Sequence, residues 1–134
     1  PDSGVIFGME GKTLSVVFQE DRLFPDLTVL QNAEVAGTNG EAWLARLGLQ
    51  SELSAYPQSL SGGMRRRVAI LRALLAEYDL LFLDEPFKGL DRETKETVMA
   101  DTRRRCAGRT VLLVTHDVAE LDAMGAVVRL DLST

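Results

Sequence analysis

The stretch of this sequence that most constrains the fold is an apolar run that ends in two adjacent carboxylates. Residues 80–83 read Leu-Leu-Phe-Leu, and Asp84, Glu85 and Pro86 follow directly. A short unbroken apolar run predicts a strand buried on both faces, as in a parallel sheet. Because α/β proteins bind ligands at the carboxyl ends of their strands, we expect Asp84 to be a magnesium ligand and Glu85 to orient or deprotonate a water molecule. A lone Asp-Glu pair would more simply be a solvated turn, so this interpretation depends on its companions.

Two more apolar runs end in polar side chains. Residues 14–18 and 110–115 also predict buried strands, and they are followed by Gln19 and by His116, the single histidine. Taken alone, Gln19 is more simply a strand-end residue bonded to the backbone, and a lone histidine is usually structural. Together, an amide, two carboxylates and an imidazole at the ends of parallel strands are the groups that phosphoryl transfer to water requires.

A glycine-rich helix start lies between the first two strands. Residues 60–64 read Leu-Ser-Gly-Gly-Met, and Ser61 is a good N-cap. Gly62 and Gly63 let another backbone come close, and the free N–H groups of a helix start suit phosphate oxygens. The helix that follows is predicted to bury one face, which carries four apolar residues at helical spacing: Met64, Val68, Leu71 and Leu75.

Three arginines, Arg65, Arg66 and Arg67, crowd the first turn of this helix. The helix dipole disfavours cations at that end, and an anion docking nearby would explain them. Neighbours on a helix point about 100° apart, so we expect two of the three to point into solvent.

Local signals predict the remaining elements. Asp91 is the expected N-cap of a helix over residues 93–106, and capping alone would explain this carboxylate. The other predicted elements are short helices that begin at Thr28 and cover residues 41–47, 51–55 and 117–124, and short strands over residues 5–7 and 126–131.

Composition excludes several classes of protein. The chain has 134 residues, enough for one domain, and a net charge of −5 that argues against a nucleic-acid binder. One cysteine, Cys106, excludes an internal disulfide and suggests a reducing compartment. No apolar run approaches the roughly 18 residues of a membrane span, so we expect any membrane connection to go through a partner.

These motifs together resemble the nucleotide-binding ATPase domain of ATP-binding cassette (ABC) transporters. Gln19 matches the family's Q-loop, residues 60–64 its signature motif, and residues 80–85 its Walker B motif with the catalytic glutamate. Residues 89–91, Gly-Leu-Asp, match the D-loop, and His116 matches the switch histidine. The wording of residues 23–29 is similar to that of importer ATPases for nitrate, sulfonate or taurine.

The resemblance implies a fold and a division of the chain. The expected fold is α/β, a P-loop NTPase (RecA-like) parallel-sheet core with a small helical subdomain and the N-terminal part missing. Residues 1–20 and 78–134 would form the core sheet with flanking helices. Residues 21–77 would form the helical signature subdomain.

The resemblance also implies a function: an ATP-hydrolysing subunit that couples ATP and Mg²⁺ chemistry in a head-to-tail dimer to solute transport. Asp84 and Gln19 would hold the metal, Glu85 would be the catalytic base, and His116 would contact the γ-phosphate. Asp91 would belong to the dimer interface. The partner's ATP would be bound by the signature residues Ser61, Gly62, Gly63 and Met64. The implied partners are a second ABC subunit and a transmembrane permease, with the chain peripheral at the cytoplasmic face of the cell membrane.

One family motif is absent from the sequence. No G-x-x-x-x-G-K-[ST] loop occurs, and Gly11-Lys12-Thr13 lacks the spacing of a phosphate cradle. Because the chain starts at Pro1 and not Met, we expect it to begin inside a longer parent, with the P-loop just upstream. Two alternatives stay open: a truncated, non-catalytic subunit that lends its signature helix to an intact partner, and a soluble ABC ATPase of DNA repair or translation. Nothing in the sequence suggests the coiled-coil insertions or paired domains of the second.

Overall fold

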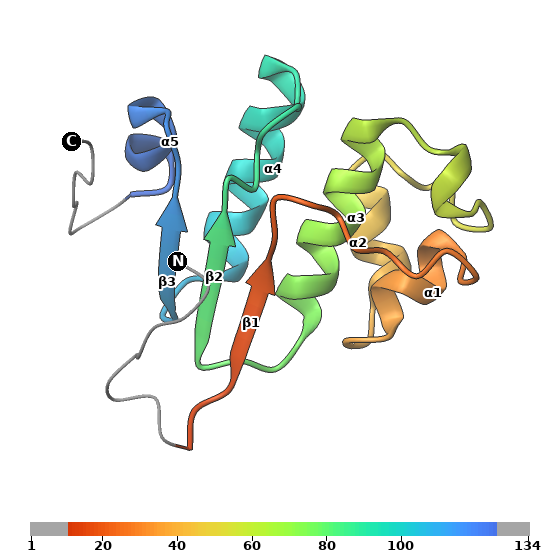
Figure 1. Cartoon of the computed structure of the whole chain (residues 1–134), viewed down its shortest axis with the longest axis horizontal. Helices are drawn as coiled ribbons and strands as arrows, with labels where there is room; N and C mark the ends of the chain where they lie inside the picture. The colour runs from red at the N-terminus through yellow and green to blue at the C-terminus, as the bar shows by residue number, and fades with distance from the viewer. Residues whose placement is uncertain (1–10, 126–134) are drawn as a thin grey trace.

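The sheet of this protein is parallel. The computed structural model describes residues 11–125, and its three strands are β1 (Leu14–Val17), β2 (Leu80–Asp84) and β3 (Thr110–Val114), in the order β1-β2-β3 (Figure 1). Both pairs are parallel, with Leu80 opposite Leu14 on one side and Thr110 on the other. All three carboxyl ends therefore lie at one edge, which confirms the predicted α/β class.

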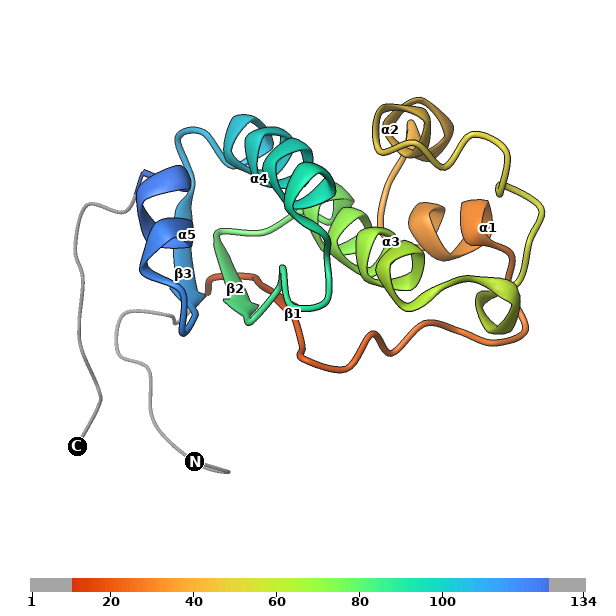
Figure 2. The same ribbon diagram turned by 90° about the horizontal axis from the view of Figure 1, so that it is seen from above.

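Only one face of this sheet is covered by the described helices. In Figure 2 the helices α3 (Gly62–Leu75) and α4 (Arg92–Arg105) lie on the same side of the strands. Side chains that point toward them are buried, as for Val17, Leu81 and Leu83. The prediction that β1 and β3 are buried strands is wrong for part of each, because Leu14 of β1 is 48% exposed and Leu112 of β3 is 47% exposed. An apolar run alone cannot tell how many layers cover a strand.

The segment between β1 and β2 is helical. It contains α1 (Val29–Glu34), α2 (Gly40–Arg46), the 3-10 turn η1 (Pro57–Ser59) and α3. The predicted capping box of α1 is present: Gln31 N–H donates to Thr28 Oγ1 at 3.2 Å, and Thr28 N–H donates to Gln31 Oε1 at 2.9 Å. The predicted helix over residues 51–55 is wrong, because this stretch forms turns before Pro57.

Helix α3 is the centre of the molecule and packs against β1, α1, α2 and α4. Val68, Leu71 and Leu75 are buried, as the helical spacing predicts. Its C-terminal end touches the loop before α2 so closely that a Cβ on Gly37 would lie 2.3 Å from the Leu75 carbonyl oxygen. Only glycine allows this approach of two backbones.

The C-terminal part adds two helices whose caps the sequence predicts. Asp91 Oδ1 accepts a hydrogen bond from Thr94 N–H at 2.8 Å at the start of α4. Asp117 Oδ1 accepts from Ala119 N–H at 2.9 Å at the start of α5 (Val118–Ala123). The strands expected over residues 5–7 and 126–131 lie outside the described residues. Within residues 11–125, no helix combines the length and hydrophobicity needed to cross a bilayer.

Candidate functional site

The structure brings four of the predicted site residues together at the carboxyl edge of the sheet. Gln19 follows β1, Asp84 ends β2, Glu85 comes next, and His116 follows β3. Gln19 Nε2 donates to Asp84 Oδ1 at 3.3 Å, and His116 Nε2 lies 3.4 Å from Glu85 Oε1. The imidazole is 95% exposed, whereas the Glu85 side chain is only 12% exposed. The edge therefore has one shielded carboxylate beside groups that solvent or a ligand can reach.

Glu85 has an unusual backbone conformation. Its φ is +47°, in the left-handed region that glycine favours, and its N–H donates to the Val114 carbonyl oxygen at 2.8 Å. Its Oε1 is buried and makes no hydrogen bond among the described residues, although His116 Nε2 lies 3.4 Å away. A non-glycine residue in this region costs about 1–2 kcal/mol. Such strain, together with a carboxylate oxygen that lacks a hydrogen bond, is typical of functional positions and not of packing.

This strain can be measured. We expect Glu85→Gly to be more stable than Glu85→Ala by about 1–2 kcal/mol, because both lose the carboxylate but only glycine relieves the left-handed backbone. Urea denaturation followed by circular dichroism measures the two free energies of unfolding. Equal stabilities, or a more stable alanine variant, would contradict the strained conformation.

The donor set at this edge fits magnesium. Carboxylate and amide oxygens are suitable ligands, and Mg²⁺ is usually held by one or two protein oxygens together with substrate phosphates and water. Among residues 11–125, no group of three or more His, Cys, Asp or Glu side chains could hold a metal by itself. Asp84 supplies the carboxylate. Gln19 turns its amide nitrogen toward Asp84, so its oxygen would reach a metal there only after the amide rotates.

The glycine-rich helix start is formed as the sequence predicts. Ser61 Oγ accepts a hydrogen bond from Met64 N–H at 3.2 Å and caps α3. A Cβ on Gly62 would have Arg65 Nη2 at 3.9 Å as its nearest neighbour, and one on Gly63 would have Leu90 Cδ2 at 3.7 Å. Both contacts are ordinary, and neither glycine has a positive φ. Nothing within residues 11–125 requires glycine here, so the absent side chains favour the approach of another molecule.

The side chains of the three arginines at this helix start do not point where the sequence predicts. All three donate to backbone carbonyl oxygens: Arg65 to Leu60 at 2.7 Å, Arg67 to Leu47 at 2.7 Å, and Arg66 to Phe18 at 2.6 Å. Arg66 is also buried. The expectation that two of them point into solvent is wrong, because neighbouring loops fold over this end of α3 and present carbonyl groups that need donors.

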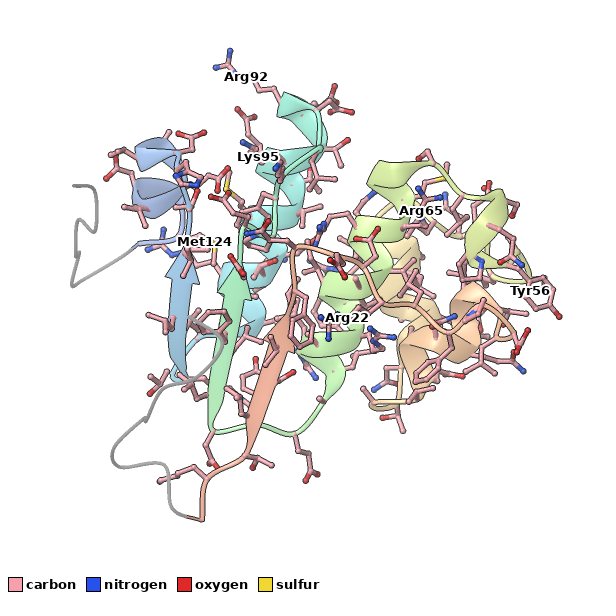
Figure 3. All side chains as sticks on the ribbon, viewed as in Figure 1. Arg22, Tyr56, Arg65, Arg92, Lys95 and Met124 are labelled. Carbon is pink, nitrogen blue, oxygen red and sulfur yellow. The ribbon has the colours of Figure 1, made fainter. Side chains whose placement is uncertain are left out.

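A part-buried network around Glu120 was not predicted from the sequence. Lys95 of α4, labelled in Figure 3, donates from Nζ to Glu120 Oε2 of α5 at 2.8 Å, and lies 3.5 Å from Asp117. Thr115 Oγ1 donates to Glu120 Oε1 at 2.6 Å, so both oxygens of this buried carboxylate are paired. The network joins the helix that Asp91 caps to the residues on either side of His116. Its members are separated by up to 25 positions, and no local spacing reveals them.

Ser61, Gly62 and Gly63 do not meet the strand-edge residues. In the part of the chain that the structure describes, no hydrogen bond or ion pair joins them to Gln19, Asp84, Glu85 or His116. Residues 89–91 lie closer to them, since the side chain of Leu90 is the neighbour of Gly63. The side chain of Asp91 caps α4, and its hydrogen bond from the Thr94 N–H lowers the pKa of this carboxyl. The molecule therefore carries two separate candidate surfaces, the sheet edge and the helix start.

The fold and the strand edge define a class, an α/β domain whose parallel strands end in polar side chains at one edge of the sheet. Comparison with known proteins narrows that class. A family model described as ABC transporter matches residues 7–88. The chain belongs to the ABC transporter family, which confirms the resemblance noted in its motifs.

Individual relatives agree with this assignment. The chain is 42% identical to the aliphatic sulfonates import ATP-binding protein SsuB 2 of Rhizobium johnstonii, over 88% of this chain and 53% of the relative. It is 39% identical to the formylaminopyrimidine import ATP-binding protein ThiZ of Halalkalibacterium halodurans, over 90% of this chain and 53% of the relative. The chain thus spans about half the length of the curated relatives it matches.

A solved structure supports the same fold. The dimeric post-hydrolysis state of the ATP-binding cassette MJ0796 bound to ADP and Pi superposes with a TM-score of 0.73 at 30% identity. The match covers 84% of this chain and 56% of that one.

Proposed function

We propose that this chain supplies the hydrolytic strand edge and the signature helix of an ABC importer ATPase. The observation that carries the proposal is the meeting of Gln19, Asp84, Glu85 and His116 at one sheet edge. In this role Asp84 and Gln19 hold magnesium, which neutralises charge on the phosphates when bound. Glu85 positions or deprotonates the attacking water, and its buried, hydrogen-bond-free oxygen suits an acceptor of a proton or of a water hydrogen bond. His116, exposed beside it, contacts the γ-phosphate.

The helix start serves a second molecule. Ser61, Gly62, Gly63 and Met64 bind the γ-phosphate of ATP held by a partner ABC subunit, and Asp91 belongs to the interface between the two. This role is supported by two glycines that no contact within residues 11–125 requires. The dimeric form of the solved relative supports it too. In the same proposal, residues 1–20 and 78–134 form the core and residues 21–77 the helical subdomain.

The proposed setting is the cytoplasmic face of a membrane, where the subunit works with a transmembrane permease. The relatives' names describe import ATP-binding proteins for aliphatic sulfonates and for formylaminopyrimidine. Because those solutes differ, membership of the family selects neither of them for this chain.

A mixing experiment tests the proposal. The fluorescently labelled chain is sedimented with an intact ABC ATPase subunit that carries its own P-loop and a Gln in place of its catalytic Glu, so that ATP is not consumed. A mixed complex is expected with MgATP and not with MgADP, because the γ-phosphate is the shared contact. If labelled chain fails to join the intact subunit in MgATP, the proposal for the helix start is wrong.

A second role needs no P-loop. A non-catalytic subunit that only lends its signature helix to an intact partner would use residues that this sequence contains, and the sequence has no G-x-x-x-x-G-K-[ST] loop. The same mixture tests the lending role when the intact subunit is catalytically active. The lending role predicts ATP turnover at the partner's P-loop, together with loss of that turnover in a chain carrying Ser61→Arg.

The sequence also predicts what the isolated chain will not do. Without the lysine and the backbone cradle of a P-loop, nothing holds the β- and γ-phosphates. We expect isothermal titration of the chain with MgATP to give no heat of binding. A dissociation constant in the micromolar range would contradict this expectation and would require a different phosphate site.

A further inference from the structure

The segment that carries Gln19 is attached to α3 by arginine side chains. After β1, residues 18–22 run past this helix, and four of their backbone carbonyl groups accept hydrogen bonds from two guanidinium groups. Arg66 donates to the carbonyl oxygens of Phe18, at 2.6 Å, and Gln19. Arg72 donates to those of Asp21, at 3.3 Å, and Arg22, at 2.9 Å.

The side chains of Arg66 and Arg72 point toward this segment and are partly or fully shielded from solvent. Arg66 is 6% exposed, and its Nε lies 3.3 Å from Asp21 Oδ1, so its charge is balanced within the same segment. Burial lowers the pKa of Arg72. A guanidinium is planar and presents its N–H groups as a fork, so one side chain can hold two carbonyl groups in a fixed orientation. Figure 3 shows Arg65 on the upper part of α3 and Arg22 beside the same helix.

The attachment links the two candidate surfaces of the molecule. Arg66 follows Gly62 by four positions, one helical turn, so it lies on the same side of α3 as that glycine. At its other end it holds the carbonyl group of Gln19, whose side chain donates to Asp84. These contacts therefore connect the glycine-rich helix start to the backbone of Gln19.

We propose that Arg66 and Arg72 are positioning residues that fasten residues 18–22 to α3, so that Gln19 follows the signature helix when a partner docks on it. The inference rests on the proposed function, because docking at Ser61, Gly62 and Gly63 is what would move the helix. Through these two arginines, docking of a partner at the helix start would change the position of Gln19 at the sheet edge, where Asp84 lies.

The first test uses the free chain and needs no nucleotide. Amide order parameters from ¹⁵N relaxation are measured for residues 19–22 in the wild type and in Arg66→Lys, Arg66→Gln, Arg72→Gln and Arg67→Gln. Lysine keeps the charge but loses the fork. Arg67→Gln is the matched control, since it deletes an arginine that also donates to a carbonyl group, but in another segment.

We expect order parameters near 0.85 in the wild type and in Arg67→Gln, and values that fall below about 0.6 in the Arg66 and Arg72 variants. The carbonyl ¹³C shifts of Phe18 and Gln19 should move in the Arg66 variants alone. A folded Arg66→Lys or Arg72→Gln chain with an unchanged segment 18–22 overturns the proposal, even if Arg66→Gln does not fold.

The second test asks whether the link transmits docking. The side-chain ¹⁵N signal of Gln19 is followed while the chain is titrated with the intact subunit in MgATP. It should shift in the wild type. Arg66→Lys should bind the intact subunit with an affinity within about threefold of that of the wild type. Its Gln19 signal should nevertheless not shift on binding. An equal shift in both chains overturns the link, whereas absence of any complex contradicts the proposed function and leaves the free-chain test to decide the attachment.

Discussion

Gly62→Asp is expected to weaken MgATP-dependent pairing with an intact ABC subunit by at least about a hundredfold while leaving the fold intact. A carboxylate at this position would face the γ-phosphate, and juxtaposed like charges cost several kcal/mol at an interface. Inside the chain the change is tolerated, because among the described residues no atom outside the backbone of α3 itself comes closer than 3.9 Å to a Cβ on Gly62. An acidic residue in the first turn of a helix is also favoured by the helix dipole.

The result should therefore separate binding from stability. Sedimentation of the labelled chain measures pairing, and urea denaturation measures the free energy of unfolding, which should be equal to or above that of the wild type. Gly62→Asn has nearly the same shape without the charge and is the matched control; it should pair more weakly than the wild type but better than Gly62→Asp. Undiminished pairing of Gly62→Asp would show that the helix start does not meet a phosphate.

Lys95→Met is expected to destabilise the protein by about 3 kcal/mol. It leaves the Glu120 carboxylate, 4% exposed, without its cation, and removing one partner of a buried ion pair typically costs 3–5 kcal/mol. We take the lower end because Lys95 is 24% exposed and Thr115 still donates to Glu120. The double variant Lys95→Met with Glu120→Met removes both charges and should recover most of the loss. A cost below about 1 kcal/mol for Lys95→Met would mean that the pair behaves as a surface pair.

The ion pair between Lys95 and Glu120 should also make the free energy of unfolding depend on pH. The hydrogen bond to Glu120 raises the pKa of Lys95 above its ordinary value of 10.5. A raised pKa in the folded state means that the stabilisation is complete below about pH 10.5 and is lost as the pH rises through the folded value. Tyr78, whose pKa is raised to about 12 mainly by burial, adds a further alkaline loss in every variant. The difference in stability between wild type and Lys95→Met should therefore shrink above pH 10.5, and a constant difference would contradict the assignment.

Local chemistry is the part of this fold that could be predicted from sequence. The caps at Thr28, Ser61 and Asp91 and the parallel strands are set by neighbours within a few residues, or by the length of an apolar run. The meeting of Gln19, Asp84, Glu85 and His116 was also predictable, because parallel strands end at one edge of a sheet. Their chemical roles remain proposals.

The unpredicted features depend on distant partners. The open face beside Leu112 depends on which layers surround the sheet, and an apolar run does not encode that. The Lys95–Glu120 pair joins two helices, and the Arg66 contacts span 48 positions to the carbonyl group of Phe18. Long-range contacts between side chains and backbone carbonyl groups leave no periodic signal, since every residue except proline presents the same backbone groups.

The engagement of Arg65, Arg66 and Arg67 with carbonyl groups has a consequence for how α3 can recognise an anion. Because Arg66 and Arg67 donate to the carbonyl groups of other segments, the helix start offers mainly its own N–H groups and the Ser61 hydroxyl, which are dipoles. Arg65, whose Nη2 lies 3.9 Å from the position of a Cβ on Gly62, adds one full charge beside them. Dipoles act over a shorter range than ions, and they depend more on shape and less on screening by dissolved salt. A surface of this kind selects its ligand by fit at contact, and raising the ionic strength should change its affinity far less than three free guanidinium groups would imply.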